Sequence, residues 1–301
     1  MATRGTDRMT QPRLTIAIPT YNRAKQLDRQ LNWAVNAIAD RWDEIELLVS
    51  DNASPDETPQ VCQKWQAQTN GRVRIFRQSK NIGVNRNCLF CIQEARGDFV
   101  WTVSDDDVVL EGTLGWVLSK ISNDADDQLA FIHLNGSISS PEGIIFRQSV
   151  YPFQSDQISA PGCKLLESCI DINEDWLFLF TANIYKTTIA QQAIKTWPDI
   201  KNNLAFSLFL AGYAAAHGAM TLRSEPSLLD MAYYARPNWL VIINRDIPEV
   251  YRKLAESGYT TSLIRRQILK RLSFVSFVLR FPTDFLSALP TYWFALRLPK
   301  H

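Results

Sequence analysis

Short apolar runs alternate with amphipathic stretches along the first hundred residues of the chain. Four runs rich in β-branched, aliphatic and aromatic residues predict buried strands, at residues 14–18, 45–49, 73–76 and 99–103. Apolar positions at helical spacing predict helices over residues 24–39 and 58–68 and from residue 84 onward. This alternation of strands and helices with short connections predicts a mostly parallel α/β sheet with helices on its faces.

Polar residues follow three of these predicted strands. Pro19, Thr20 and Asn22 follow the first strand, Asp51 and Asn52 follow the second, and three adjacent aspartates at residues 105–107 follow the fourth. In open α/β sheets, ligands bind beyond the carboxyl ends of the strands. Neighbouring carboxylates repel one another, so a bound cation would stabilise the cluster at 105–107, although a solvated acidic turn is the simpler alternative.

Several other kinds of site lack support in the sequence. No glycine-rich phosphate loop follows a predicted strand, so dinucleotide-binding and P-loop interpretations lose their main signal. The spacing after Asp105 does not fit a calcium-binding loop. The five cysteines are irregularly spaced and indicate a reducing compartment, and Cys88 and Cys91 are interpreted as core thiols on a helix.

The pattern is weaker beyond residue 110. Apolar runs predict strands at residues 129–134 and 143–147, and His133 is expected to be a hydrogen-bonded core histidine. The apolar segment at residues 178–185 fits either a core strand or the wall of a binding pocket. A helix is predicted at residues 204–211.

The C-terminal segment has a different composition. Residues 260–301 hold seven Lys and Arg residues against one acid, Asp284, a net charge of +6, while the whole chain carries +1. Apolar residues recur there at helical spacing with cations between them, which predicts a basic amphipathic helix. Two interpretations stay open: the segment docks on the rest of the protein, or it binds an anionic membrane surface.

Five short motifs in order resemble the family 2 glycosyltransferases of the GT-A fold. They are residues 16–23 (IAIPTYNR), 48–54 (LVSDNAS), Asn81-Ile-Gly83 with Asn87, residues 95–98 (ARGD) and residues 104–107 (SDDD). The resemblance covers about a third of the chain, and within the family it points to abequosyl- or rhamnosyltransferase-like proteins.

This resemblance implies a fold and an activity. The expected fold is GT-A, a mostly parallel sheet flanked by helices, with a helical C-terminal extension. The expected function is an inverting, metal-dependent transfer of a sugar from a nucleotide-sugar donor to a hydroxyl of a glycan or lipid-linked glycan in surface polysaccharide biosynthesis. The alternative is a non-catalytic descendant that binds a nucleotide or glycan.

The resemblance also implies roles for individual residues. Asp51 would contact the nucleobase or ribose, and the rest of the nucleotide pocket would be formed by Pro19, Thr20, Asn22, Asn81, Asn87 and Asp105. The metal ligands for Mg²⁺ or Mn²⁺ would be Asp105, Asp106 and Asp107, with Asp106 the first choice. Many relatives have an aspartate where this chain has Ser104, so the first carboxylate of the family's metal-binding motif is missing here.

An inverting transferase needs a general base to take the proton of the acceptor hydroxyl. Relatives often place it in an acidic pair before a helix, and this chain has Lys201-Asn202-Asn203 there. The candidate bases are therefore Asp199 and Asp175. His217 and Arg236 lie where relatives recruit late contacts, and both are interpreted as structural.

The predicted organisation is a disordered tail at residues 1–12, a catalytic domain at 13–240 and a helical basic segment at 241–301. The catalytic domain divides into a nucleotide-binding half, 13–110, and an acceptor half, 111–240. With no signal peptide or membrane span recognised, we expect a cytoplasmic protein, peripheral at the inner face of the membrane. The net charge of +1 gives no indication of nucleic-acid binding.

Overall fold

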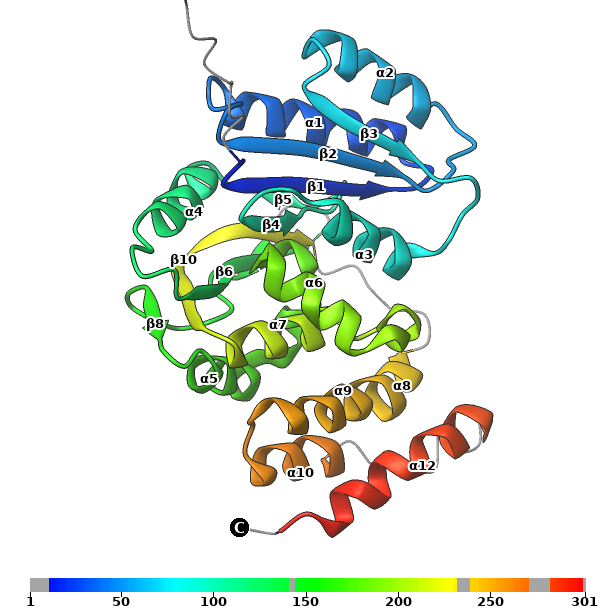
Figure 1. The fold of residues 1–301 in the computed structure, drawn as a ribbon, viewed down its shortest axis with the longest axis vertical. Coiled ribbons are helices and arrows are strands. Elements are labelled where there is room, and N and C mark those ends of the chain that lie inside the picture. Colours follow the sequence, from blue (N-terminus) through cyan, green and yellow to red (C-terminus); the bar gives the residue numbers. More distant parts are fainter. Residues whose placement is uncertain (1–10, 141–143, 232–238, 271–281, 300–301) are drawn as a thin grey trace, which may run out of the picture.

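One mixed sheet forms the centre of the molecule (Figure 1). The computed structural model describes residues 11–140, 144–231, 239–270 and 282–299, so most of the predicted tail at 1–12 lies outside the described residues. Within them, ten strands form the sheet in the order β3-β2-β1-β4-β9-β6-β10-β5, with β7 paired to β6 and β8 to β10.

The N-terminal half follows the predicted alternation. The strands are Leu14–Thr20 (β1), Ile45–Asp51 (β2), Val73–Arg77 (β3) and Phe99–Thr102 (β4), and the helices are Ala24–Ile38 (α1), Thr58–Gln68 (α2) and Val84–Glu94 (α3). β1 pairs in parallel with β2 and β4, and β2 pairs in parallel with β3. Every residue of β1 and β2 is buried, as expected for parallel strands covered on both faces. The predicted strands and helices of this half are confirmed.

Gly97 allows the loop before β4 to lie against β1. A Cβ atom at this position would come within 2.5 Å of the backbone nitrogen of Thr15 and 2.6 Å of the carbonyl carbon of Leu14. The Gly97 amide instead donates a 2.8 Å hydrogen bond to the hydroxyl of Thr15. The glycine of the 95–98 motif is therefore required by this close approach.

The second half contains strands of both directions. Its strands are Val108–Val109 (β5), Leu129–Ser139 (β6), Ile145–Arg147 (β7), Gln157–Ser159 (β8), Asn183–Lys186 (β9) and Ala219–Met231 (β10). Its helices are Thr113–Ser122 (α4), Cys163–Asn173 (α5), Thr187–Thr196 (α6) and Phe206–Ala216 (α7), with 3-10 turns at Glu174–Phe178 (η1), Phe180–Ala182 (η2) and Pro198–Asn202 (η3). β9 runs antiparallel between β4 and β6 and so joins the two halves into one sheet.

The C-terminal helices form a layer on the side of α7 away from the sheet (Figure 1). They are Trp239–Val241 (α8), Ile242–Asp246 (η4, a π-helical turn), Ile247–Leu254 (α9), Ala255–Ser257 (η5), Thr261–Leu269 (α10) and Pro282–Arg297 (α12). The hydroxyl of Tyr259 donates to the carbonyl of Gly212 in α7, and that of Tyr292 donates to the carbonyl of Asn244, each at 2.8 Å. The segment therefore docks on the domain through buried contacts.

Candidate active site

The carboxyl ends of β1 and β4 open into a cavity of about 810 Å³. Because the two strands are parallel neighbours, Thr20 at the end of β1 reaches Asp105, which follows β4. The Thr20 hydroxyl lies 2.6 Å from Oδ2 of Asp105, and both residues line the cavity. This places the predicted acidic cluster where ligands of α/β sheets bind.

Asp105 is the buried member of this cluster, with 3% of its surface exposed. Its carboxylate accepts hydrogen bonds from Thr20 and, at 3.1 Å, from the guanidinium of Arg23. Arg23 also forms an ion pair with Asp106, whose other carboxylate oxygen accepts a hydrogen bond from the hydroxyl of Ser104. Arg23 therefore supplies positive charge to two neighbouring carboxylates.

Burial raises the pKa of Asp105 to about 6, and the hydrogen bond from Thr20 and the charge of Arg23 offset this only in part. The ionised form of Asp105 therefore depends on nearby positive charge, which Arg23 supplies in the free protein.

The donor set fits a divalent ion. Asp105, Asp106 and Asp107 all line the cavity and offer hard carboxylate oxygens, which Mg²⁺ and Mn²⁺ prefer. Among the described residues, no three acidic, His or Cys side chains are already gathered around a common metal position. Mg²⁺ usually takes only one or two carboxylates together with phosphates and waters, so a metal that arrives with a diphosphate suits this cluster.

The predicted nucleotide residues divide into two groups. Pro19, Thr20, Asn81 and Asn87 line the cavity. The side-chain oxygen of Asn81 accepts hydrogen bonds from the amide of Asn52 at 3.0 Å and from the backbone of Gly83 at 2.9 Å, which orders the loop before α3. Asn87, on α3, is held by two hydrogen bonds to Ser50 at the end of β2.

Asp51 and Asn22 lie outside the described lining of the cavity. Asp51 is 1% exposed, and its carboxylate accepts hydrogen bonds from the backbone of Ser54 at 2.9 Å and from Arg77 at 2.6 Å. Asn22 has a φ of 56°, a left-handed conformation that asparagine tolerates, and its backbone donates to the hydroxyl of Ser54. Both residues therefore shape the loops that border the cavity.

The sequence matches the model of one protein family, described as "Glycosyl transferase family 2", over residues 15–148. The match spans β1 to β4 and the acidic cluster that follows them. Residues 15–148 belong to glycosyl transferase family 2.

Curated relatives of this glycosyltransferase domain include three bacterial enzymes. Abequosyltransferase RfbV of Salmonella typhimurium is 34% identical over 38% of this chain and 34% of its own length. A GalNAc(5)-diNAcBac-PP-undecaprenol beta-1,3-glucosyltransferase of Campylobacter jejuni is 32% identical over 36% of this chain and 34% of its own length. The poly(ribitol-phosphate) beta-N-acetylglucosaminyltransferase TarS of Staphylococcus aureus is 27% identical over 74% of this chain. The aligned regions span about a third of the length of each of these relatives.

Solved structures support the GT-A fold. Residues 1–349 of Staphylococcus aureus TarS in complex with UDP-GlcNAc superpose with a TM-score of 0.66 at 16% identity, over 95% of this chain and 82% of that one. The mannosyltransferase PcManGT of Pyrobaculum calidifontis, in complex with GDP-Man and Mn²⁺, gives 0.55 at 15% identity, over 96% of this chain and 76% of that one. The expectation of a GT-A fold is confirmed.

Part of the cavity wall comes from the second half of the chain. Asp175, Trp176 and Phe178 on η1 and Phe180 on η2 line the cavity together with the acidic cluster of the glycosyltransferase domain. Trp176 is fixed by a 2.8 Å hydrogen bond from its indole nitrogen to the carbonyl of Leu134. Part of the predicted 178–185 segment is thus a pocket wall, and its end, β9, is a core strand.

The structure separates the two candidate bases. Both carboxylates are exposed, but Asp175 lines the cavity, whereas Asp199, on η3, is not part of the described lining. Next to Asp175, Glu174 is 7% exposed and accepts a hydrogen bond from the hydroxyl of Tyr251 on α9. The C-terminal layer therefore supports the turn that carries Asp175.

Three site residues had no assigned role in the sequence interpretation: Arg23, Arg77 and Tyr251. Arg23 stands in the first motif, but its carboxylate partners lie more than 80 residues away in sequence. Only the parallel pairing of β1 with β4 places them together. The sequence offered one signal for this pairing. Arg23 is a cation at the end of the motif that follows the first predicted strand, and the acidic cluster follows the fourth.

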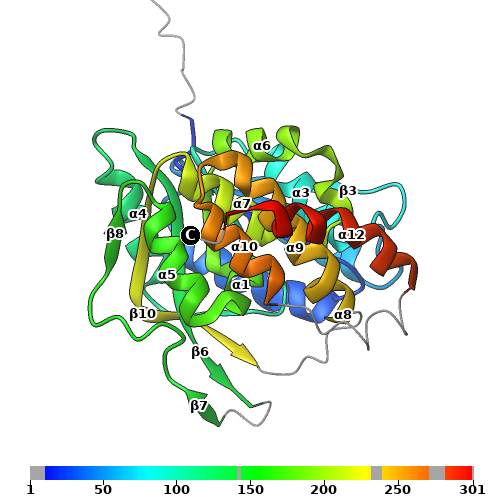
Figure 2. The same ribbon diagram turned by 90° about the horizontal axis from the view of Figure 1, so that it is seen from below.

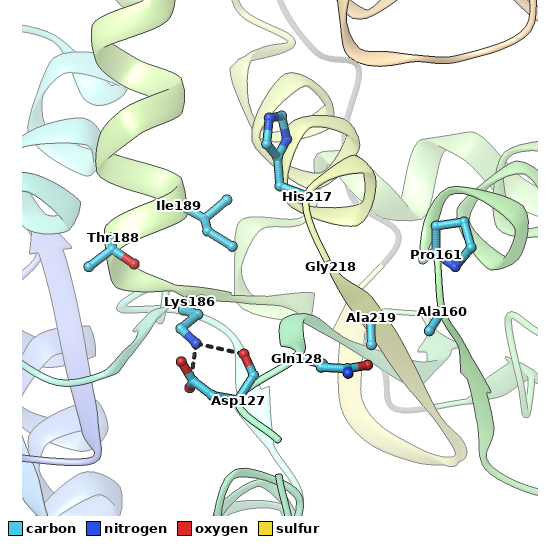
Figure 3. Close-up of a pocket in the computed structure, with 10 residues that line it drawn as sticks. All are labelled: Asp127, Gln128, Ala160, Pro161, Lys186, Thr188, Ile189, His217, Gly218 and Ala219. Carbon is cyan, nitrogen blue, oxygen red and sulfur yellow. Dashed lines mark hydrogen bonds and ion pairs between the residues drawn. The ribbon is translucent and has the colours of Figure 1, made fainter. Parts of the chain in front are cut away.

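A second cavity, of about 400 Å³, lies at the other end of the sheet (Figure 3). Lys186, which ends β9, pairs with Phe99 at the start of β4, so this cavity is remote from Asp105. It is lined by Lys186, which forms an ion pair with Asp127, and by His217. His217 stacks on Tyr213, with ring centroids 4.0 Å apart. Its structural interpretation stays a prediction, and Arg236 lies outside the described residues.

His133, Cys88 and Cys91 are core residues, as predicted. His133 is fully buried, lies 2.8 Å from the side-chain oxygen of Asn183 and 3.1 Å from the Tyr151 hydroxyl, and burial lowers its pKa to about 4. Cys88 and Cys91 are free and fully buried on α3. Burial raises the pKa of the Cys88 thiol to about 12, which makes it unreactive.

Proposed function

We propose that the protein is an inverting, metal-dependent glycosyltransferase that moves a sugar from a nucleotide-sugar donor to a hydroxyl of a glycan or lipid-linked glycan. The observation that carries this proposal is the buried Asp105 beside Asp106, facing a cavity of about 810 Å³ that is lined by the glycosyltransferase domain and by residues between 173 and 180. Two of the relatives are named as an abequosyltransferase and as a glucosyltransferase of an undecaprenol-linked glycan, and on this basis we place the protein in surface polysaccharide synthesis.

Asp105, Asp106 and Asp107 would hold Mg²⁺ or Mn²⁺. Departure of a nucleoside diphosphate concentrates negative charge on its phosphate oxygens, and a bound divalent ion would supply the charge that stabilises it. Arg23, which pairs with Asp105 and Asp106 in the free protein, would be released to contact the diphosphate.

The nucleotide is proposed to lie along β1, β2 and the loop before α3. Thr20, Asn81 and Asn87 already line this part of the cavity. Asp51 is proposed to contact the nucleobase or ribose. To do so, its carboxylate must give up part of its contact with Arg77 and bind the ligand instead. Pro19 would pack against the nucleotide, and Asn22 would act through the loop that it shapes.

Asp175 is the proposed general base. It lies in the cavity wall formed by η1, so an acceptor hydroxyl between this wall and the donor could pass its proton to the Asp175 carboxylate. Inversion requires this single base, because the acceptor oxygen attacks the sugar from the side opposite the departing diphosphate. Asp199, on η3, is not part of the described cavity lining, so the geometry favours Asp175.

The proposed acceptor gives the protein a location. The name of the Campylobacter jejuni relative includes an undecaprenol-linked acceptor, and such a lipid is presented at a membrane. No helix in the described parts of the chain is long and apolar enough to cross a membrane. We propose that the protein acts in the cytoplasm, peripherally at the inner face of the membrane.

The test is turnover with a panel of nucleotide sugars, Mn²⁺ and isolated glycan or lipid-linked acceptors. We expect one donor to release its nucleoside diphosphate only when an acceptor is present, and nuclear magnetic resonance of the product should show inversion at the anomeric carbon. Donor binding without release under any acceptor would favour the alternative, a non-catalytic nucleotide- or glycan-binding descendant. Full turnover in excess EDTA would contradict the metal-dependent mechanism.

A further inference from the structure

Large apolar side chains form an exposed stripe on α12. Leu286, Trp293 and Leu296 are 62%, 60% and 59% exposed, and Leu289 between them is half-buried. Their spacings of three, four and three residues place all four on one side of the helix. We call Leu286, Leu289, Trp293 and Leu296 the α12 stripe.

The orientation of the stripe is fixed by the opposite face of the helix. Ala288, Tyr292 and Ala295 are at most 6% exposed, and the Tyr292 hydroxyl donates to the carbonyl of Asn244. Arg265 on α10 donates a 2.9 Å hydrogen bond to the carbonyl of Ala295. Figures 1 and 2 show α12 as the outermost helix of the C-terminal layer, so the stripe faces away from the protein.

Positive charge lies beside the stripe at Arg297, whereas Arg266 on α10 is balanced by an ion pair with Asp171. The guanidinium of Arg297 lies 5.5 Å from the ring of Trp293. Arg280 and Lys300 flank α12 in the sequence, within a segment of net charge +6. Its acidic residue, Asp284, forms an ion pair with Arg245, so its charge is already balanced by the protein.

We propose that the α12 stripe is a docking surface for an anionic lipid bilayer. Leucine and tryptophan on one face of a helix with cations beside them suit insertion at headgroup depth, where Lys and Arg meet anionic lipid. A protein partner would cover the leucines equally well, but the excess positive charge favours a negatively charged surface. The inference rests on the proposed function only in that a lipid-linked acceptor would be presented at this surface.

Point variants test this surface better than truncation, because α10 and α12 bury Ile264, Ile268 and Ala295 against the domain. The experiment is co-sedimentation of the full chain with phosphatidylglycerol-containing and with pure phosphatidylcholine vesicles, at low and high salt. We expect binding to the anionic vesicles that weakens with salt. Leu286→Ser combined with Trp293→Ser should weaken it by at least roughly tenfold, since each side chain would lose its burial in the bilayer.

The matched control is Ile158→Ser, which removes a 76% exposed apolar side chain from β8, outside the C-terminal layer, and should leave vesicle binding unchanged. Circular dichroism melting of each variant verifies its fold. Wild-type protein that does not sediment with anionic vesicles, or a double variant that binds as tightly as wild type, overturns the proposal. Wild-type dimerisation that the double variant abolishes, without vesicle binding, would assign the stripe to a second copy. Sedimentation needs neither donor nor turnover, so its outcome is independent of the transfer chemistry.

Discussion

At the scale of single residues, the site depends on how charge is balanced around Asp105. This carboxylate is buried beyond the ends of β1 and β4, and Arg23, which precedes α1, supplies positive charge to it in the free protein. Arg23 is itself partly exposed, with 42% of its side chain accessible, so it can leave without unfolding the surrounding core. The arrangement suits a site in which a metal and a diphosphate replace an internal cation.

The first prediction concerns pH. The pKa of Asp105 rises from an ordinary 3.8 to about 6 in the folded protein, so the folded state binds this proton more tightly than the unfolded state. The stability that Asp105 contributes is therefore present below pH 3.8 and lost as the pH rises through about 6. Asp105→Asn does not titrate, and between about pH 4 and pH 7 it should gain up to about 3 kcal/mol relative to wild type. Urea unfolding in EDTA measures the difference, and a pH-independent gap would contradict the assignment.

The second prediction concerns Arg23. Arg23→Gln removes the cation that competes with a metal for Asp105 and Asp106. We expect Mn²⁺ alone to raise the melting temperature of the variant more than that of wild type. Arg29→Gln is the control, because Arg29 donates a hydrogen bond to the backbone carbonyl of Asp106 and not to its carboxylate. An equal effect of Mn²⁺ on wild type and Arg23→Gln would show that Arg23 does not compete with the metal.

The third prediction concerns Asp51. Asp51→Asn keeps the shape of a buried side chain and removes the charge that pairs with Arg77. If Asp51 contacts the nucleotide, free nucleotide and donor should both bind about 1.5–3 kcal/mol more weakly, the usual cost of losing a hydrogen bond to a charged group. Isothermal titration calorimetry measures this. Unchanged nucleotide affinity together with lower stability would make Asp51 only a residue of the 51–54 turn.

At the scale of elements, η1 connects the cavity to the C-terminal layer. It carries Asp175 into the cavity wall, while its neighbour Glu174 accepts a hydrogen bond from Tyr251 on α9. The same turn places Trp176 against β6 through the carbonyl of Leu134. A short turn held at both ends in this way can fix a catalytic side chain without regular secondary structure around it.

The fourth prediction tests this turn. Asp175→Asn should lower kcat by about 10²–10⁴, the usual contribution of a general base, while donor binding stays unchanged. The matched control is Asp199→Asn, which alters an exposed carboxylate on η3 and should leave kcat as in wild type. Steady-state kinetics with the donor found in the panel gives both values. A much lower kcat for Asp199→Asn than for Asp175→Asn would instead identify Asp199 as the base.

At the scale of the whole molecule, β9 joins a regular α/β half to a mixed half. The first half could be predicted from the sequence, because its strands are continuous apolar runs and its polar motifs directly follow their ends. The acidic cluster was found for the same reason. The antiparallel placement of β9 was not predicted, since a four-residue strand has the same apolar pattern in either direction.

The parts of the site that could not be predicted depend on contacts between segments that are distant in the sequence. Glu174 and Tyr251 are 77 residues apart, and Arg23 and Asp105 are 82 apart, so neither pair has a local pattern. The sequence left both Asp175 and Asp199 as candidates: Asp199 is the carboxylate nearest to residues 201–203, and Asp175 stands in an acidic pair before an apolar segment. Only the fold decides which one faces the cavity. The docking of α12 likewise depends on Ala288, Tyr292 and Ala295, which form its buried face. The amphipathic pattern in the sequence did not identify this face.

The most direct test of the central claim is a thermal shift measurement of nucleoside diphosphates with Mn²⁺, in wild type and Asp106→Asn. The variant removes a charge and keeps the shape of the side chain, so its fold should be intact. One nucleotide at about a hundred times its dissociation constant should stabilise the wild type by about 2.7 kcal/mol, and EDTA or Asp106→Asn should abolish the effect. If no nucleotide stabilises the protein, or if the shift survives both EDTA and Asp106→Asn, then Asp105, Asp106 and Asp107 do not form a metal-diphosphate site.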